Sequence, residues 1–192
     1  MKILLGCFRS NLISDYLIEC GHDVTTCDIL PALHSNSHLQ GDLLSLDHYD
    51  YDFLLACPPC QYLTKAQGHR FNLCPDMRAN TIAAVQFVKD VYSLPVARIA
   101  LENPPGHLNK MWRYPSQLVR PYYFGDPYQK EICLWLKNVP PLMSGPHNPK
   151  RGSINNHVNG RMDAPTKSGV RSSWNRFPCM VAAMESQWFR TF

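Results

Sequence analysis

Four short runs of strand-like composition mark the first half of the chain, over residues 2–7, 24–29, 51–56 and 98–101, and all but 24–29 are mainly apolar. Between the first two runs, apolar side chains recur at helical spacing over 11–20, and Gly21 follows as a C-terminal cap. Between the last two runs, the same spacing predicts a helix over 77–92. Because strand and helix patterns alternate, we predict an α/β fold with a mostly parallel sheet and helices on both faces.

The second half of the chain is less regular. Two apolar runs, over 122–125 and 132–136, are joined by a Gly-Asp-Pro turn, which predicts a C-terminal antiparallel hairpin. Residues 140–173 show no periodicity and are rich in Pro, Gly, Asn and Ser, so we predict a long basic loop there. Helical spacing returns over 177–188. The cations of the predicted loop include Lys150, Arg151, Arg161, Lys167 and Arg171.

Size and composition restrict the interpretation. A length of 192 residues fits one domain over 1–192. No apolar run in the sequence is long enough to predict a transmembrane helix, and the run 3–5 is too short for a signal peptide. We therefore expect a cytoplasmic protein in which most of the eight cysteines form no disulfide. A net charge of +4 permits a polyanionic partner without requiring one.

Polar residues stand at the ends of several predicted strands. Asp28 closes the second run, Cys57 and Cys60 follow the third, and Glu102 and Asn103 follow the fourth. In a parallel sheet, ligands bind beyond the carboxyl ends of the strands. We therefore expect these side chains to meet at one edge of the sheet and to form the functional site there.

Cys60 allows several interpretations. It follows two prolines at a strand end, and a helix beginning nearby would favour its thiolate, which is the nucleophilic form. A free cysteine is more often a buried structural residue. Cys57 and Cys60 also form a C-x-x-C pair, which is typical of redox sites. With His69 and Cys74 they would supply four zinc ligands, although the spacing matches no familiar zinc motif.

Three other positions carry candidate chemistry. A carboxyl group buried at Glu102 would be able to donate a proton near neutral pH, whereas an exposed one would only begin a loop. Asp28 suits a ribose hydroxyl of a nucleotide cofactor, or else caps a loop. The segment 6–11 contains a single glycine and lacks a dinucleotide or P-loop fingerprint. This argues against NAD and ATP and leaves a smaller cofactor bound through backbone amides.

Several short motifs occur in order along residues 2–188. They are Gly41-Asp42, Pro59-Cys60-Gln61 within the stretch 58–64, Glu102-Asn103-Pro104, Phe-Gly-Asp-Pro-Tyr-Gln-Lys at 124–130, Leu-Trp-Leu-Lys-Asn-Val-Pro-Pro-Leu at 134–142, and Phe-Pro-Cys-Met-Val-Ala at 177–182. Through this ordered set the chain resembles the DNA cytosine-5 methyltransferases, and most closely the short forms found in bacteriophages and prophages. The resemblance implies a single Rossmann-like domain of the S-adenosylmethionine-dependent methyltransferase type, located in the host cytoplasm if a phage encodes it.

The resemblance also implies a role for each candidate residue. Cys60 would add to carbon 6 of cytosine, Glu102 would protonate ring nitrogen 3, and Asn103 would hold the loop that carries Cys60. Lys130 stands where the family has an arginine and would contact the base or the cysteine region. The cofactor would be S-adenosylmethionine, and no metal is implied. The cofactor-binding residues would be Gly6, Cys7, Phe8, Asp28, Ile29, Asp42 and Pro58.

Two departures from the family bear on cofactor and substrate. The first loop lacks the family's Phe-x-Gly-x-Gly-Gly and carries bulkier residues at 9–11. The interval between Lys130 and the last motif contains only the basic loop, where the family inserts a target-recognition domain. We therefore expect methylation of cytosine in DNA, single-stranded DNA included, with little sequence specificity. A free cytosine nucleotide as substrate, and a non-catalytic nucleotide- or nucleic-acid-binding protein with the same fold, are the alternatives.

Overall fold

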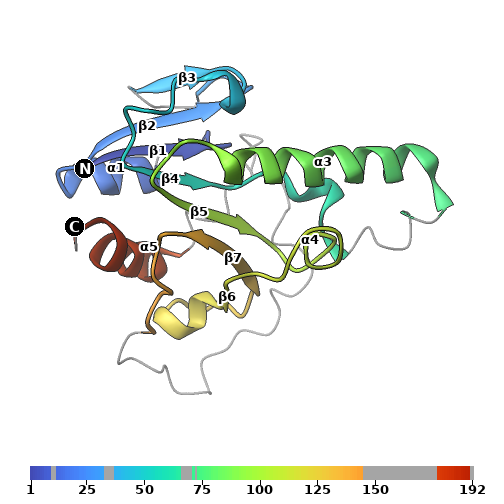
Figure 1. The fold of residues 1–192 in the computed structure, drawn as a ribbon. Helices are drawn as coiled ribbons and strands as arrows, with labels where there is room; N and C mark the ends of the chain where they lie inside the picture. The colour runs from blue at the N-terminus through green and yellow to red at the C-terminus, as the bar shows by residue number, and fades with distance from the viewer. Residues whose placement is uncertain (10–11, 33–36, 66–70, 72, 145–176, 191–192) are drawn as a thin grey trace.

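The computed structural model describes residues 1–9, 12–32, 37–65, 71, 73–144 and 177–190. These residues form one seven-stranded sheet with helices on both faces (Figure 1). The strand order is β3-β2-β1-β4-β5-β7-β6. The strands are β1 (Lys2–Gly6), β2 (Asp23–Asp28), β3 (His38–Gln40), β4 (Phe53–Ala56), β5 (Arg98–Asn103), β6 (Gln117–Val119) and β7 (Ile132–Lys137).

The sheet is mostly parallel. Strands β3, β2, β1, β4 and β5 run in one direction, and β7 is antiparallel to both β5 and β6. The first five strands follow the 3-2-1-4-5 order of doubly wound dinucleotide-binding sheets, and β7 is inserted before β6. The predicted α/β class is therefore confirmed, and the topology is compatible with a Rossmann-like fold. The order reverses between β1 and β4, which is where such sheets bind ligands.

The helices cover the two faces of the sheet with separate apolar layers. They are α1 (Leu12–Glu19), α3 (Pro75–Ser93), α4 (Leu108–Met111) and α5 (Pro178–Met184), which continues into the π-helix η8 (Glu185–Phe189). Helices α1 and α5 pack in one layer with Leu5 and Leu55, and α3 and α4 pack in the other with Leu4 and Leu54. Neighbouring residues of one strand thus face opposite layers, as the two-residue period of a strand requires.

The three longer helices confirm the predictions made from hydrophobic spacing over 11–20, 77–92 and 177–188. Gly21 ends α1 with a φ of +87°, which favours glycine. Residues 140–144 of the predicted basic loop are irregular, and residues 145–176 lie outside the described part of the chain. Within the described residues, no helix has the length and apolar character needed to cross a membrane.

The C-terminal hairpin is present, but its first strand was predicted at the wrong place. The stretch 122–125 is not a strand: Pro121–Phe124 form the 3-10 helix η4, and β6 just before it pairs with β7. Pro121 has a fixed φ and no N–H to donate to a strand ladder, so the chain turns there. The aromatic composition of the stretch favoured a strand, and the proline overrides it. The short polar strand β3 was not predicted.

Candidate functional site

The carboxyl ends of β2, β1, β4 and β5 lie in one row. Gly6 of β1 is paired with Cys27 of β2 and with Ala56 of β4, and Ala56 is paired with Leu101 of β5. The residues that follow these positions are neighbours across the sheet, in the order Asp28, Cys7, Cys57 and Glu102. Adjacent strands are about 4.8 Å apart, so three strand spacings place Asp28 roughly 14 Å from Glu102. The row is therefore long enough for a cofactor at one end and a second reactant at the other.

The Cys60 turn, residues 58–65, follows β4 near the middle of this row. It contains a short 3-10 helix, η2 (Cys60–Tyr62), which begins at Cys60. The Cys60 side chain is exposed. Asn103 of β5 reaches the turn, and its Nδ2 donates to Pro58 O at 2.8 Å. The neighbouring strand thus fixes the position of an accessible thiol.

Three residues that were not predicted from the sequence also hold the Cys60 turn. Thr81 of α3 donates from Oγ1 to Tyr62 O at 3.0 Å, and His107 N donates to Leu63 O at 2.7 Å. Gly106 lies so close to the turn that a Cβ atom at its position would be 1.8 Å from Leu63 O. No periodic pattern indicated these residues, and the available sign was a glycine directly after two prolines in a loop.

Glu102 is a buried carboxylate beside Lys130. Its side chain is 8% exposed, and Lys130 Nζ lies 3.9 Å from Oε1, which is too far for a hydrogen bond. Within the described residues, neither Oε1 of Glu102 nor Oδ1 of the adjacent Asn103 has a hydrogen-bond partner, although both atoms are buried. A buried polar atom without a partner costs free energy. A ligand that donates hydrogen bonds would be stabilised here.

Two aspartates lie at the other end of the row. Asp28 Oδ1 accepts from Leu30 N at 2.9 Å, and Asp42 Oδ1 accepts from Leu44 N at 3.0 Å. The local backbone thus engages one oxygen of each carboxylate. Ile29 is 70% exposed and Leu30 is 47% exposed, so apolar side chains lie at the surface beside Asp28. A carboxylate next to exposed apolar groups matches the hydroxyls and the base of a nucleoside.

The loop after β1 packs on β2 and lies close to both aspartates. Phe8 is buried, and its N donates to Cys27 O at 3.1 Å. Cys7 has a φ of +59°, in the left-handed region that favours glycine. Burial, followed by the charges of Asp28, Cys27 and Asp42, raises the pKa of Cys7 to about 12. The Cys7 thiol is therefore protonated at neutral pH and is not a nucleophile.

Gly6 and Pro58 lie between the two ends of the row. Cys57 N donates to Gly6 O at 3.0 Å, which joins the end of β1 to the end of β4. A Cβ atom at Gly6 would be 2.6 Å from Leu43 Cδ2, so a larger residue there would have to displace the buried Leu43 side chain. Pro58 is buried. At Gly6 and Pro58, the row therefore offers mainly backbone atoms to a ligand.

Asp126 joins two of the motif segments that are far apart in the sequence. The side chain is buried, and its two oxygens accept from Cys179 N at 3.1 Å and Met180 N at 2.9 Å. These N–H groups belong to the first turn of α5, where helical partners are lacking and a negative charge is favourable. Asp126 therefore positions α5 against the segment that carries Lys130.

The zinc and redox interpretations find no supporting contact in the described residues. Among them, no three His, Cys, Asp or Glu side chains are placed to hold a metal ion, and His69 lies outside them. No disulfide joins Cys57 to Cys60 in the described chain. Burial, aided by nearby carboxylates, raises the pKa of both Cys27 and Cys133 to about 11.

Comparison with known proteins adds no identification. No protein-family model matches the chain, and no curated protein matches it at a significant level. The functional interpretation therefore depends on the motifs and on the chemistry of the row: an exposed thiol, a buried carboxylate beside a lysine, and a pair of aspartates.

Proposed function

We propose that the protein transfers a methyl group from S-adenosylmethionine to carbon 5 of cytosine in DNA. The observation that carries the proposal is a pair of buried acceptors, Glu102 Oε1 and Asn103 Oδ1, which have no hydrogen-bond partner among the described residues and lie next to the turn that presents Cys60. A carboxylate is a suitable acceptor for the exocyclic amino group of cytosine. The two buried oxygens would accept hydrogen bonds from the cytosine ring, Lys130 would donate to it, and the Cys60 thiol would be its nucleophile.

In the proposed mechanism, the chain makes and breaks one covalent bond. The Cys60 thiolate adds to carbon 6 of cytosine, and a proton from Glu102 neutralises the electron density that reaches ring nitrogen 3. Carbon 5 then takes the methyl group, and the cofactor sulfonium would leave as a neutral thioether. Loss of the carbon-5 proton to a base, return of the nitrogen-3 proton to Glu102 and departure of the Cys60 thiolate restore the aromatic ring. Lys130 would stabilise the negative charge left on Glu102 once the proton has moved to nitrogen 3, because it is the cation nearest that carboxylate among the described ion pairs.

The aspartate end of the row fits the cofactor implied by the resemblance. Among the described hydrogen bonds Asp28 uses only Oδ1, so Oδ2 would accept from ribose hydroxyls, and Ile29 offers an apolar surface for adenine, with Asp42 nearby. Cys7 reproduces a glycine-like backbone in a loop that lacks the family's glycines. Gly6, Phe8 and Pro58 complete the set that would hold the cofactor. S-adenosylmethionine would supply an electrophilic methyl group.

A methyl-transfer assay tests the proposal. S-adenosylmethionine with a tritiated methyl group should label cytosine-containing DNA, and Cys60→Ser should abolish labelling because serine is a much weaker nucleophile. Cys57→Ser is the matched control and should retain labelling. If Cys60→Ser labels DNA as well as the unmodified protein does, or if no DNA of either strandedness is labelled, the proposal fails. Loss of activity in both variants would favour a redox pair.

The same assay separates the alternatives. Incubation with dCMP followed by mass spectrometry tests a free nucleotide as substrate. Methylation of dCMP but not of DNA would assign the activity to nucleotides. Binding of S-adenosylmethionine without transfer to either substrate would favour the non-catalytic binding protein.

A further inference from the structure

Charge is unevenly divided along the chain. Residues 1–64 contain two Lys or Arg against eight Asp or Glu, whereas residues 65–192 contain 17 against seven. Strands β1 to β4 come from the first part, and β5 to β7 come from the second together with α3 and α4. Strands β3, β2 and β1, from the first part, lie on one side of the sheet, and β5, β7 and β6, from the second part, lie on the other (Figure 1). We call the side formed by β3, β2 and β1 the acidic side.

Several acids of the second part do not offset its positive surface. Glu102, Asp126 and Glu185 are buried. Glu131 is already paired with Arg120, with 2.7 Å between Oε1 and Nη2. Among the described residues of this part, the exposed charge is therefore mainly that of lysines and arginines.

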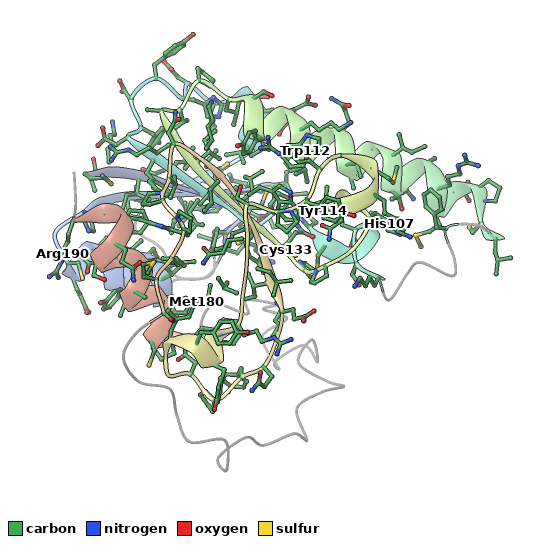
Figure 2. The ribbon with its side chains drawn as sticks, turned by 60° about the horizontal axis from the view of Figure 1, so that its bottom comes forward. His107, Trp112, Tyr114, Cys133, Met180 and Arg190 are labelled. Carbon is green, nitrogen blue, oxygen red and sulfur yellow. The ribbon has the colours of Figure 1, made fainter. Side chains whose placement is uncertain are left out.

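A cluster of basic and aromatic side chains lies directly beside the Cys60 turn. Lys65 ends that turn, and its N donates to Pro105 O at 3.3 Å. The ring of His107 lies 4.9 Å from that of Phe71, centroid to centroid, and the guanidinium of Arg78 lies 5.7 Å from the Phe71 centroid. Figure 2 shows His107 near α3, on the opposite side of the molecule from Arg190. We call Lys65, Phe71, Arg78, His107 and Lys110 the basic surface.

Arg78 is well placed to meet a phosphate group. An arginine that lies over an aromatic ring keeps the N–H groups at its edge available for bidentate contacts. The buried residues of α3 begin at Thr81, so the first turns of the helix, including Arg78, project past the carboxyl edge of the sheet (Figure 1). Asp76 is the acidic residue on these turns and partly offsets the cations. The positive end of the helix dipole acts in the opposite sense.

His107 contributes a ring to the basic surface at neutral pH. Burial, and then the positive charge of Lys110, lower the pKa of His107 below its usual value. The imidazole is therefore mainly neutral at pH 7, and its tilted contact with the Phe71 ring, at an interplanar angle of 33°, supports the ring that lies under Arg78. The cationic groups of the surface are Lys65, Arg78 and Lys110.

We propose that the basic surface binds the phosphate backbone of a single polynucleotide strand and leads that strand to Cys60. Phosphate contacts provide affinity that does not depend on sequence. Such contacts would provide affinity for DNA in a chain whose interval between Lys130 and the last motif is too short to hold a target-recognition domain. The acidic side repels the same strand, so the strand runs over α3 and α4. The identity of the reacting base rests on the proposed function, but binding of the backbone does not.

Fluorescence anisotropy with a labelled oligothymidylate tests the surface independently of methyl transfer, because this probe contains no cytosine. The triple variant Lys65→Ala/Arg78→Ala/Lys110→Ala should bind at least about ten-fold more weakly, and the slope of log K against log salt should fall by about 2, since each phosphate contact contributes roughly 0.7 for single strands. Lys89→Ala is the control. It removes a cation from the same helix, α3, three turns beyond Arg78, and should leave binding unchanged.

Two further measurements make the outcome decisive. Phe71→Leu keeps an apolar side chain but removes the ring under Arg78, and it should weaken binding less than the triple variant does. Thermal unfolding checks that each variant folds. Unchanged binding by the triple variant, an equal loss in Lys89→Ala, or binding to anionic lipid vesicles but not to the oligonucleotide would overturn the inference. Methyl transfer by the unmodified protein to cytosine-containing DNA reports separately on the proposed chemistry, so failure of one proposal is distinguishable from failure of the other.

Discussion

The two ends of the row differ in how their polar atoms are satisfied. At the β2 end, Asp28 and Asp42 each accept a hydrogen bond from a backbone N–H two residues further along the chain. At the β5 end, Glu102 Oε1 and Asn103 Oδ1 are buried without a partner among the described residues, and Lys130 is too distant to donate to Glu102. Hydrogen bonds within a local turn account for the positions of Asp28 and Asp42. No such hydrogen bond among the described residues accounts for the burial of Glu102 Oε1 and Asn103 Oδ1.

This difference shows where the structure itself points to a ligand. An aspartate that closes a turn contributes to folding whether or not a cofactor binds, so its presence is weak evidence for binding. A buried carboxylate without a hydrogen bond is a net cost to folding, and such costs are concentrated at functional sites. The β5 end therefore supports a ligand-binding role without help from the resemblance. At the β2 end, a test must distinguish aspartates that only stabilise a turn from aspartates that also bind a cofactor.

The largest effect is expected from Glu102→Gln. This substitution preserves the shape of the side chain but removes the acidic proton, so methyl transfer should fall by about 10²- to 10⁴-fold. Affinity for S-adenosylmethionine, measured by calorimetry, should not change, because Glu102 lies at the far end of the row. Glu131→Gln is the control, since Glu131 lies on the same segment as Lys130 but pairs with Arg120 at the surface. Equal losses in both variants would contradict a specific role for Glu102.

A second comparison uses one glycine from each end. A Cβ atom at Gly106 would be 1.8 Å from Leu63 O, whereas nothing lies within 4 Å of the corresponding position at Gly41. Gly106→Ala should therefore displace the Cys60 turn and lower the free energy of unfolding by about 3 kcal/mol. Gly41→Ala should leave both stability and activity near their original values. Thermal and urea unfolding measure the stability of each variant, and the methyl-transfer assay measures its activity. A Gly106→Ala protein with full activity would show that the turn needs no support from this loop.

The sequence predicted the sheet better than it predicted the supports of the site. Strands β1, β4 and β5 each bury a continuous apolar run, and α3 repeats its buried residues at helical spacing, so hydrophobic pattern alone locates them. The strand predicted over 122–125 was wrong because Pro121 outweighs the strand preference of the three aromatic residues that follow it. Strand β3 was not predicted because its three residues are polar or exposed. They are held in place by pairing with β2 rather than by burial.

The candidate site shows the same limit at the level of single residues. Asp28, Cys60 and Glu102 follow apolar runs, so their places at strand ends are visible in the sequence. Thr81 and Gly106 support Cys60 from 21 and 46 residues away along the chain. Their contacts involve backbone carbonyls, which leave no pattern in side-chain type. Contacts of this kind become visible only when the fold brings the segments together.

A smaller effect is expected at the β2 end from Asp28→Asn. Asparagine can still accept from Leu30 N, so stability should not change, but the negative charge beside the proposed ribose site is lost. Affinity for S-adenosylmethionine should fall about ten-fold, which corresponds to roughly 1.4 kcal/mol. Asp47→Asn is a close control, because Asp47 Oδ1 accepts from Tyr49 N at 3.1 Å in the same local geometry. If Asp28→Asn binds the cofactor as tightly as Asp47→Asn does, Asp28 only closes a turn.

The smallest intervention compares two thiols of the row, those of Cys7 and Cys60, without changing the sequence. Alkylation requires the thiolate, and the pKa of Cys7 is raised to about 12 by burial and by the nearby charges of Asp28, Cys27 and Asp42. At pH 8 roughly one Cys7 in 10⁴ is ionised, so iodoacetamide should leave it unmodified, whereas exposed Cys60 should react first. Raising the pH toward 12 should make Cys7 reactive, because its thiolate fraction grows about ten-fold per pH unit below the pKa. Peptide mass spectrometry after brief labelling follows both sites. Modification of Cys7 at pH 8 as fast as Cys60 would mean that the first loop is open to solvent, and the acidic, buried surroundings assigned to the β2 end would then be wrong.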